Sequence, residues 1–159
     1  MEKVISIGKQ NFASLKENHY FFVDKSHFIK DWWENGDEIT LITRPRRFGK
    51  TLNMSMLDCF FSNKYAARGD LFEGLGVWKE EKYRELQGKY PVIFLSFAAV
   101  KADQLSEAKI QIKQQIARVY EENRYLLDGD LLSGNEKKAY NEVNLHMGDA
   151  EAAAALNNM

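Results

Sequence analysis

Residues 38–51 read Glu38-Ile39-Thr40-Leu41-Ile42-Thr43-Arg44-Pro45-Arg46-Arg47-Phe48-Gly49-Lys50-Thr51. The first six of these residues are rich in β-branched and aliphatic side chains, and they predict a strand. Pro45 ends this strand because proline has no backbone N–H to contribute to a sheet. Residues 51–62 are apolar around most of the circumference of a predicted helix, which is typical of a buried helix. The stretch therefore predicts a strand, a basic loop and a buried helix in direct succession.

The sequence on either side of this stretch predicts further helices and β-type segments. The expected elements are a helical turn at 11–18, a short strand or extended segment at 19–23, a helix from Asp24 or Ser26 to Asn35, a looped stretch around Gly69, Gly74 and Gly76, a charged helix at 79–87, a strand at 91–97, a long helix at 106–125 and a weakly apolar helical tail at 135–159. The continuous apolar run of the strand at 91–97 suits burial on both faces. This order of elements predicts an α/β fold with a parallel sheet flanked by helices.

The loop between the strand and the helix matches half of a phosphate-binding pattern. The common phosphate loop reads Gly-x-x-x-x-Gly-Lys-[Ser/Thr] and lies between a strand and a helix. Gly49, Lys50 and Thr51 match its second half, whereas Arg44 stands in the place of the first glycine. In this pattern the backbone N–H groups surround the phosphates, and the helix N-terminus presents its positive dipole end. The lysine neutralises β- and γ-phosphate charge, and the hydroxyl binds Mg²⁺.

Three arginines make this loop strongly basic. The guanidinium groups of Arg44, Arg46 and Arg47 are suited to pairing with phosphate oxygens. The same residues are compatible with a basic surface turn that only joins two core elements. They are also compatible with a nucleic-acid-binding or protein-interaction module that uses loop 44–50. The residues alone favour nucleotide binding over a surface turn and leave these alternatives open.

The leading hypothesis, binding of a nucleoside triphosphate such as ATP together with Mg²⁺, gives the loop residues expected roles. Lys50 would contact the β- and γ-phosphates, Thr51 would bind Mg²⁺, and Gly49 with its neighbouring amides would form the cradle. The expected nucleotide-binding residues are Arg46, Arg47, Phe48, Gly49, Lys50, Thr51 and Leu52. No catalytic residue is identified. Asp24 and Lys25 fit two roles equally well: ordering the loop or touching nucleotide, or forming an ordinary helix cap beside an exposed lysine.

The sequence also resembles a known protein family. Residues 43–52 are similar to the phosphate loop of the bacterial AAA-ATPase-like proteins, in which arginines and a phenylalanine commonly precede Gly-Lys-[Ser/Thr]. Residues 22–26, Phe-Val-Asp-Lys-Ser, resemble the family segment Tyr-Val-Asp-Lys-[Thr/Ser]. Two weaker matches follow in the expected order at 71–75 and 91–97. Together the matches span residues 8 to 97.

The resemblance implies a P-loop NTPase-like parallel sheet flanked by helices, present in residues 1–159 as the incomplete N-terminal part of one domain. Longer members often continue into a domain similar to the PD-(D/E)xK nucleases, which has no counterpart in this sequence. The family also carries acidic residues at the end of an apolar strand downstream of the loop, where a P-loop ATPase positions Mg²⁺ and water. Residues 92–97 have the apolar run but no acid. We therefore expect a natural short form or a truncation of a longer ATPase domain, and no hydrolysis by this chain alone.

The composition is that of an ordinary globular protein. Hydrophobic residues make up 45% and charged residues 28% of the 159 residues, and the formal net charge is −1. A protein built mainly to coat nucleic acid or an anionic membrane would be more basic, so any basic site must be local. No stretch approaches the roughly 20 apolar residues of a membrane-spanning helix, and the N-terminus lacks the apolar region of a signal peptide. We therefore expect a cytoplasmic protein without a membrane partner.

The cysteine, the histidines and the sheet edges give three further expectations. Cys59 is the single cysteine, so no internal disulfide can form, and its apolar neighbours predict a small buried hydrophobe. His19, His27 and His146 are far apart in the sequence and lack the spacing of a metal site. If the predicted sheet is incomplete, its exposed apolar edges are expected to drive self-association.

Overall fold

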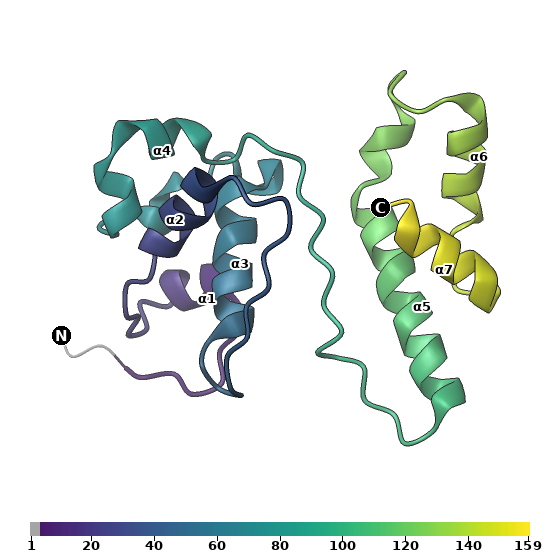
Figure 1. The fold of residues 1–159 in the computed structure, drawn as a ribbon, viewed down its shortest axis with the longest axis horizontal. Coiled ribbons are helices and arrows are strands. Elements are labelled where there is room, and N and C mark those ends of the chain that lie inside the picture. Colours follow the sequence, from purple (N-terminus) through teal and green to yellow (C-terminus); the bar gives the residue numbers. More distant parts are fainter. Residues whose placement is uncertain (1–3) are drawn as a thin grey trace. The chain divides into compact units, whose positions relative to one another are not determined.

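The computed structural model describes residues 4–159, which form helices joined by irregular segments (Figure 1). The chain divides into two compact units, with the boundary between Val92 and Ile93. The first unit contains α1 (Phe12–Glu17), α2 (His27–Asn35), α3 (Lys50–Phe61), the 3₁₀ turns η1 (Asn63–Tyr65), η2 (Gly69–Phe72) and η3 (Gly76–Lys79), and α4 (Glu81–Leu86). The second unit contains α5 (Leu105–Glu122), the 3₁₀ turn η4 (Arg124–Leu127), α6 (Gly134–Glu142) and α7 (Asp149–Asn157).

The helices predicted from the sequence are confirmed, with boundaries close to those expected. Local signals set several of their ends. The side chain of Asn11 accepts a hydrogen bond from the N–H of Ser14 and caps α1, and Gly36 ends α2 in the left-handed conformation at φ 64°. Ser133 and Glu136 form a reciprocal capping box at the start of α6. The predicted C-terminal helical tail is present as α6 and α7.

The predicted parallel sheet is wrong, because residues 4–159 contain no strand (Figure 1). One isolated parallel bridge, between Ser62 and Tyr90, is the sole β-type pairing in this part of the chain. A strand obtains its hydrogen bonds from a neighbouring strand, so β propensity within one segment does not by itself make a sheet. In the segment 38–43, Ile39 and Leu41 are 87% and 83% exposed, so no layer of helices covers them. The α/β, P-loop NTPase-like architecture expected above is therefore corrected to a helical one.

The core of the first unit forms where aromatic side chains of α1, α3 and η2 meet. Phe12, Phe60 and Phe72 are fully buried, and the ring of Phe72 lies 5.2 Å from that of Phe12 and 5.1 Å from that of Phe60. The N–H of Phe12 donates to the Ser55 hydroxyl at 3.0 Å, which fixes α1 against α3. Cys59 is also fully buried, and burial raises the pKa of its thiol to about 11. The expectation of a small buried cysteine is confirmed.

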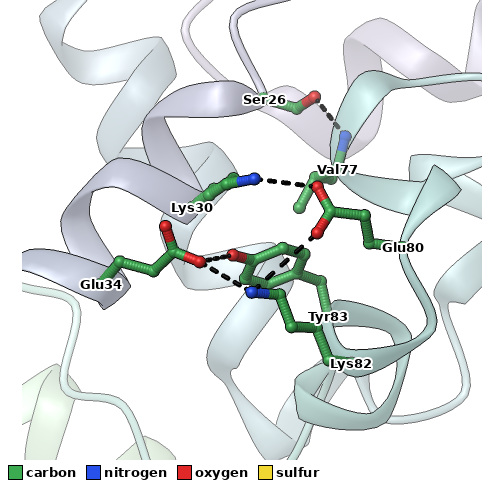
Figure 2. Close-up of polar contacts among 7 residues, drawn as sticks. All are labelled: Ser26, Lys30, Glu34, Val77, Glu80, Lys82 and Tyr83. Atoms are coloured by element: carbon green, nitrogen blue, oxygen red, sulfur yellow. Dashed lines mark hydrogen bonds and ion pairs between the residues drawn. The ribbon is translucent and has the colours of Figure 1, made fainter.

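The helix α2 is bound to the segment 76–83 by side chains at four-residue intervals, Ser26, Lys30 and Glu34, which we call the α2 clamp (Figure 2). The buried hydroxyl of Ser26 accepts a hydrogen bond from the N–H of Val77 at 3.1 Å. One turn along, the ammonium of Lys30 lies 3.0 Å from the carboxylate of Glu80. This spacing puts the three side chains on one face of the helix.

The last turn of the α2 clamp holds a fully buried tyrosine. The hydroxyl of Tyr83 donates to the Glu34 carboxylate at 2.5 Å, and the ammonium of Lys82 lies 2.7 Å from the same oxygen (Figure 2). The hydrogen bonds from Lys82 and then from Tyr83 lower the pKa of Glu34, and burial raises the pKa of Tyr83. The hydroxyl of the buried Tyr83 therefore has an ionised carboxylate, that of Glu34, as its hydrogen-bond acceptor.

The second unit is built on the 18-residue helix α5. Ile116 of α5 packs with Met147 and with Ala155 of α7 in a separate small core. Two lysines of α5, Lys109 and Lys113, place their ammonium groups 2.6 and 2.8 Å from the carboxylate of Asp149. No helix among residues 4–159 is both long and apolar enough to span a membrane.

Candidate phosphate-binding loop

The helix α3 begins at the place where the sequence puts the second half of the phosphate loop. Gly49 is its N-cap residue and has φ 74°, in the left-handed region that glycine adopts without strain. A glycine provides no side chain to cap the helix, and the first turn carries no acidic residue. The backbone N–H groups of residues 50–52 donate no hydrogen bond among the described residues. The positive end of α3 is therefore free to bind an anion.

The loop backbone makes a second left-handed step at Arg47, where φ is 68°. This conformation is uncommon for residues other than glycine and asparagine, and it costs about 1–2 kcal/mol in an ordinary L-residue. Such strain persists where the surrounding structure holds it, and it occurs often at binding sites. The two left-handed residues, Arg47 and Gly49, turn the chain sharply into α3.

The side chain of Lys50 folds back on the loop that precedes it. Its ammonium donates to the backbone carbonyl of Arg44, and to that of Pro45 at 3.1 Å. The structure thus brings together the lysine and the first residues of the loop. This role of the Arg44 and Pro45 carbonyls was not predicted from the sequence. No signal in the sequence pointed to these carbonyls, because the contact depends on the path of the loop.

The loop arginines have no partner among residues 4–159. Arg44, Arg46 and Arg47 are all exposed, and none forms an ion pair or a hydrogen bond through its guanidinium group. The chain's other four arginines each donate to a carboxylate or a carbonyl: Arg68, Arg84, Arg118 and Arg124. No acidic residue occurs between Ile39 and Leu57. The loop is therefore a local concentration of unneutralised positive charge in a chain whose formal net charge is −1.

The remaining predicted site residues lie in different surroundings. Phe48 is 60% exposed and is free to contact a ligand, whereas Leu52 packs against the aromatic core of the first unit. Leu52 therefore anchors the first turn of α3, and only its backbone N–H can face an anion. Thr51 is half-buried at the second position of the helix. Among residues 4–159, no group of three or more His, Cys, Asp or Glu residues is arranged to hold a metal ion.

The Phe-Val-Asp-Lys-Ser segment at 22–26 forms hydrogen bonds with the starts of α2 and η3. The carboxylate of Asp24 accepts hydrogen bonds from the N–H of Ser26 at 2.8 Å and from that of Gly76 at 2.7 Å. Partial burial alone would raise the pKa of Asp24, but the hydrogen bonds from Ser26 and Gly76 lower it. A Cβ at position 76 would lie 2.9 Å from the ring of His27, so a larger residue there would require this exposed ring to move. Asp24 therefore links the start of α2 to the start of η3, whereas the N-cap residue of α2 is Ser26, whose own side chain makes no cap hydrogen bond.

Comparisons with known proteins agree with the loop's sequence pattern. The chain is 35% identical over 96 residues to a protein of Azotobacter chroococcum mcd 1 described as "Uncharacterized protein in vnfD 5'region". This match covers 60% of the chain but only 17% of that relative's length. No solved structure matches the chain. The family described as predicted AAA-ATPase matches residues 6–151, and the chain therefore belongs to this AAA-ATPase-like family.

Proposed function

We propose that the chain binds a nucleoside triphosphate, ATP in particular, through loop 44–51 at the start of α3. The observation that carries the proposal is the uncapped helix N-terminus beside three unpaired arginines. A triphosphate carries several anionic oxygens close together. Both backbone N–H groups and guanidinium groups bind such oxygens. Membership of a predicted ATPase family agrees with this assignment at a coarse level.

The proposed roles follow from where each group lies. The N–H groups of residues 50–52 would cradle the phosphates, and Arg46 and Arg47 would pair with outer phosphate oxygens. The ammonium of Lys50 would exchange the carbonyls of Arg44 and Pro45 for the β- and γ-phosphates. Mg²⁺, bound through the Thr51 hydroxyl, would neutralise part of the phosphate charge.

The loop suits this ligand because its groups are donors and cations. Lys50 and the three arginines supply four positive charges, and no carboxylate lies in the first turn of α3 to repel an anion. The ring of Phe48, within the loop, is 60% exposed and is therefore accessible for stacking on a base. We propose binding without turnover for this chain.

Calorimetric titration of Mg·ATP and Mg·GTP into wild type and Lys50→Ala tests the proposal. The loss of one charge-assisted contact is expected to weaken binding by about 1.5–3 kcal/mol, which is at least tenfold. Lys138→Ala, which removes an exposed lysine of α6, is the matched control and should bind like wild type. A folded wild type that binds neither nucleotide, or a Lys50→Ala variant that binds equally well, would contradict the proposal.

Two further results would change the proposed function. Salt-sensitive binding of a fluorescent oligonucleotide that needs no nucleotide would assign the basic loop to nucleic acid instead. Phosphate release from ATP at ordinary enzymatic rates, abolished in Lys50→Ala, would show that the chain hydrolyses its ligand. Circular dichroism of each variant checks that the helices are intact, because Lys50→Ala also removes the hydrogen bonds to Arg44 and Pro45.

A further inference from the structure

The second unit contains a cavity that is separate from the loop in sequence and in chemistry. Its volume is about 420 Å³, and its walls come mainly from α5, α6 and α7. Most of the wall is apolar and includes Val119, Val143, Met147 and Ala155. A volume of this size with a mostly apolar lining is typical of sites that enclose a small organic molecule.

The buried polar groups of this cavity offer mainly acceptors, because all of their N–H and O–H donors except the second side-chain N–H of Asn123 are already used. Asn123 is only 7% exposed, and its amide nitrogen donates to the Val119 carbonyl at 2.7 Å. That bond fixes the orientation of the amide, and its oxygen accepts no hydrogen bond among the described residues. The hydroxyls of Tyr120 and Tyr140 donate to the carbonyls of Ala155 and Tyr120 respectively, so only their lone pairs remain.

The charged residues of the cavity wall are all acidic. They are Glu136, Glu142 and Glu151, and no lysine, arginine or histidine lines the cavity. One carboxylate oxygen of Glu136 accepts from the N–H of Ser133, and one of Glu151 accepts from that of Gly148. The Glu136 carboxylate also interacts with the Ser133 side chain, whereas the second oxygen of Glu151 and the side chain of Glu142 form no hydrogen bond in the described part of the chain. The exposed amide of Asn158 at the rim can either donate or accept.

We propose that this cavity binds a small organic ammonium ion, with an apolar body among the side chains of α5 and α7 and the ammonium group toward Asn123 and the glutamates. An ammonium group has three donors and no acceptor, and it therefore complements a wall of oxygen acceptors and negative charge. A carboxylate ligand would meet repulsion from the three glutamates and find only the second side-chain N–H of Asn123 as a donor among the buried groups. A neutral ligand would gain the apolar contacts alone.

The test compares three ligands with the same ring system: tryptamine, which is protonated at pH 7, neutral 3-ethylindole and anionic indole-3-propionate. Calorimetric titration of the full chain should show tryptamine binding at least about tenfold more tightly than 3-ethylindole, with no binding of the propionate. Added salt should weaken tryptamine binding and leave 3-ethylindole unchanged. Equal binding of tryptamine and 3-ethylindole, preferred binding of the anion, or no binding of tryptamine at millimolar concentration would each overturn the proposal.

Variants locate the site on the chain. Glu142→Gln and Glu151→Gln remove charge while glutamine keeps a hydrogen-bonding amide, and each should weaken tryptamine binding by about three- to fivefold. Glu107→Gln, an exposed position in the first turn of α5 outside the cavity wall, is the matched control and should have no effect. Ala139→Leu fills part of the cavity from a solvent-exposed position and should abolish binding. Equal tryptamine affinity in all four variants would overturn the proposal.

This inference is independent of nucleotide binding by the loop. Lys50→Ala should leave tryptamine affinity unchanged, and Glu142→Gln should leave Mg·ATP affinity unchanged. Failure of one proposal is therefore distinguishable from failure of the other. Loss of tryptamine binding in a folded Lys50→Ala variant would contradict the assignment to the cavity.

Discussion

The α2 clamp and the phosphate-binding loop are both charged regions of the first unit, but the charges are paired with opposite charges only in the clamp. In the clamp, Lys30 and Glu34 have partners of opposite sign, and these pairs surround the buried ring of Tyr83. In the loop, three exposed arginines have no partner among residues 4–159. The paired charges of the clamp lie around a buried ring at the contact between α2 and the segment 76–83. The unpaired arginines of the loop repel one another, and the binding of an anion would relieve this repulsion.

This comparison predicts that substitutions in the clamp change stability and that substitutions in the loop change binding. The exposed ion pairs of the clamp contribute little by themselves, because water screens them. The larger contributions come from the buried ring of Tyr83 and from the buried hydrogen bond between Ser26 and Val77.

The largest expected effect is that of Tyr83→Ala. Removal of a fully buried aromatic side chain should lower the free energy of unfolding by about 3–5 kcal/mol, as measured by urea denaturation. Tyr83→Phe keeps the ring and removes only the hydrogen bond to Glu34, so it should cost about 1 kcal/mol. If the two variants are equally stable, the ring does not hold α4 to α2 and the account of the clamp is wrong.

A smaller effect of opposite sign is expected in the loop, at Arg47. Because Arg47 has a positive φ, Arg47→Gly should relieve strain and raise the free energy of unfolding by up to about 1 kcal/mol. Arg46→Gly is the matched control, and glycine there should lower stability by about 0.5–1 kcal/mol through the entropy of the unfolded chain. A destabilised Arg47→Gly variant would show that its backbone is unstrained.

The smallest expected effect is a pH dependence within the clamp. Hydrogen bonds from Lys82 and Tyr83 lower the pKa of Glu34 below its usual 4.5. Its contribution to stability is therefore present above pH 4.5 and is lost as the pH falls through the lowered value. The stability difference between wild type and Glu34→Gln, followed by thermal unfolding, should be constant near neutral pH and shrink at acidic pH. A difference that grows on acidification would contradict this assignment.

The helices were predictable because their signals are local. Gly36 ends α2 in the left-handed conformation, and the apolar circumference of residues 51–62 predicted the buried helix α3. The sheet was not predictable in the same way, since a strand depends on a partner far away in the sequence. The residues of 38–43 have the side chains of a strand, yet Ile39 and Leu41 are exposed and no neighbouring strand pairs with them.

The candidate site was predictable in its residues but not in its internal contacts. The pattern placed Gly49 and Lys50 at the helix start, where the structure has them. The contact of Lys50 with the Arg44 and Pro45 carbonyls and the positive φ of Arg47 depend on the path of the loop in three dimensions. The motif at 22–26 had two interpretations, and neither included the contact of Asp24 with the N–H of Gly76, which lies far away in the sequence.

The most direct test of nucleotide binding by the loop is the amide NMR spectrum of the ¹⁵N-labelled chain during titration with Mg·ATP. We expect the largest chemical-shift changes at the amides of residues 49–53, and we expect Lys50→Ala to lose these changes. The backbone amides of α5, α6 and α7 should be unaffected. Absence of any change at the start of α3, or changes confined to the second unit, would contradict the proposal that loop 44–51 binds the triphosphate.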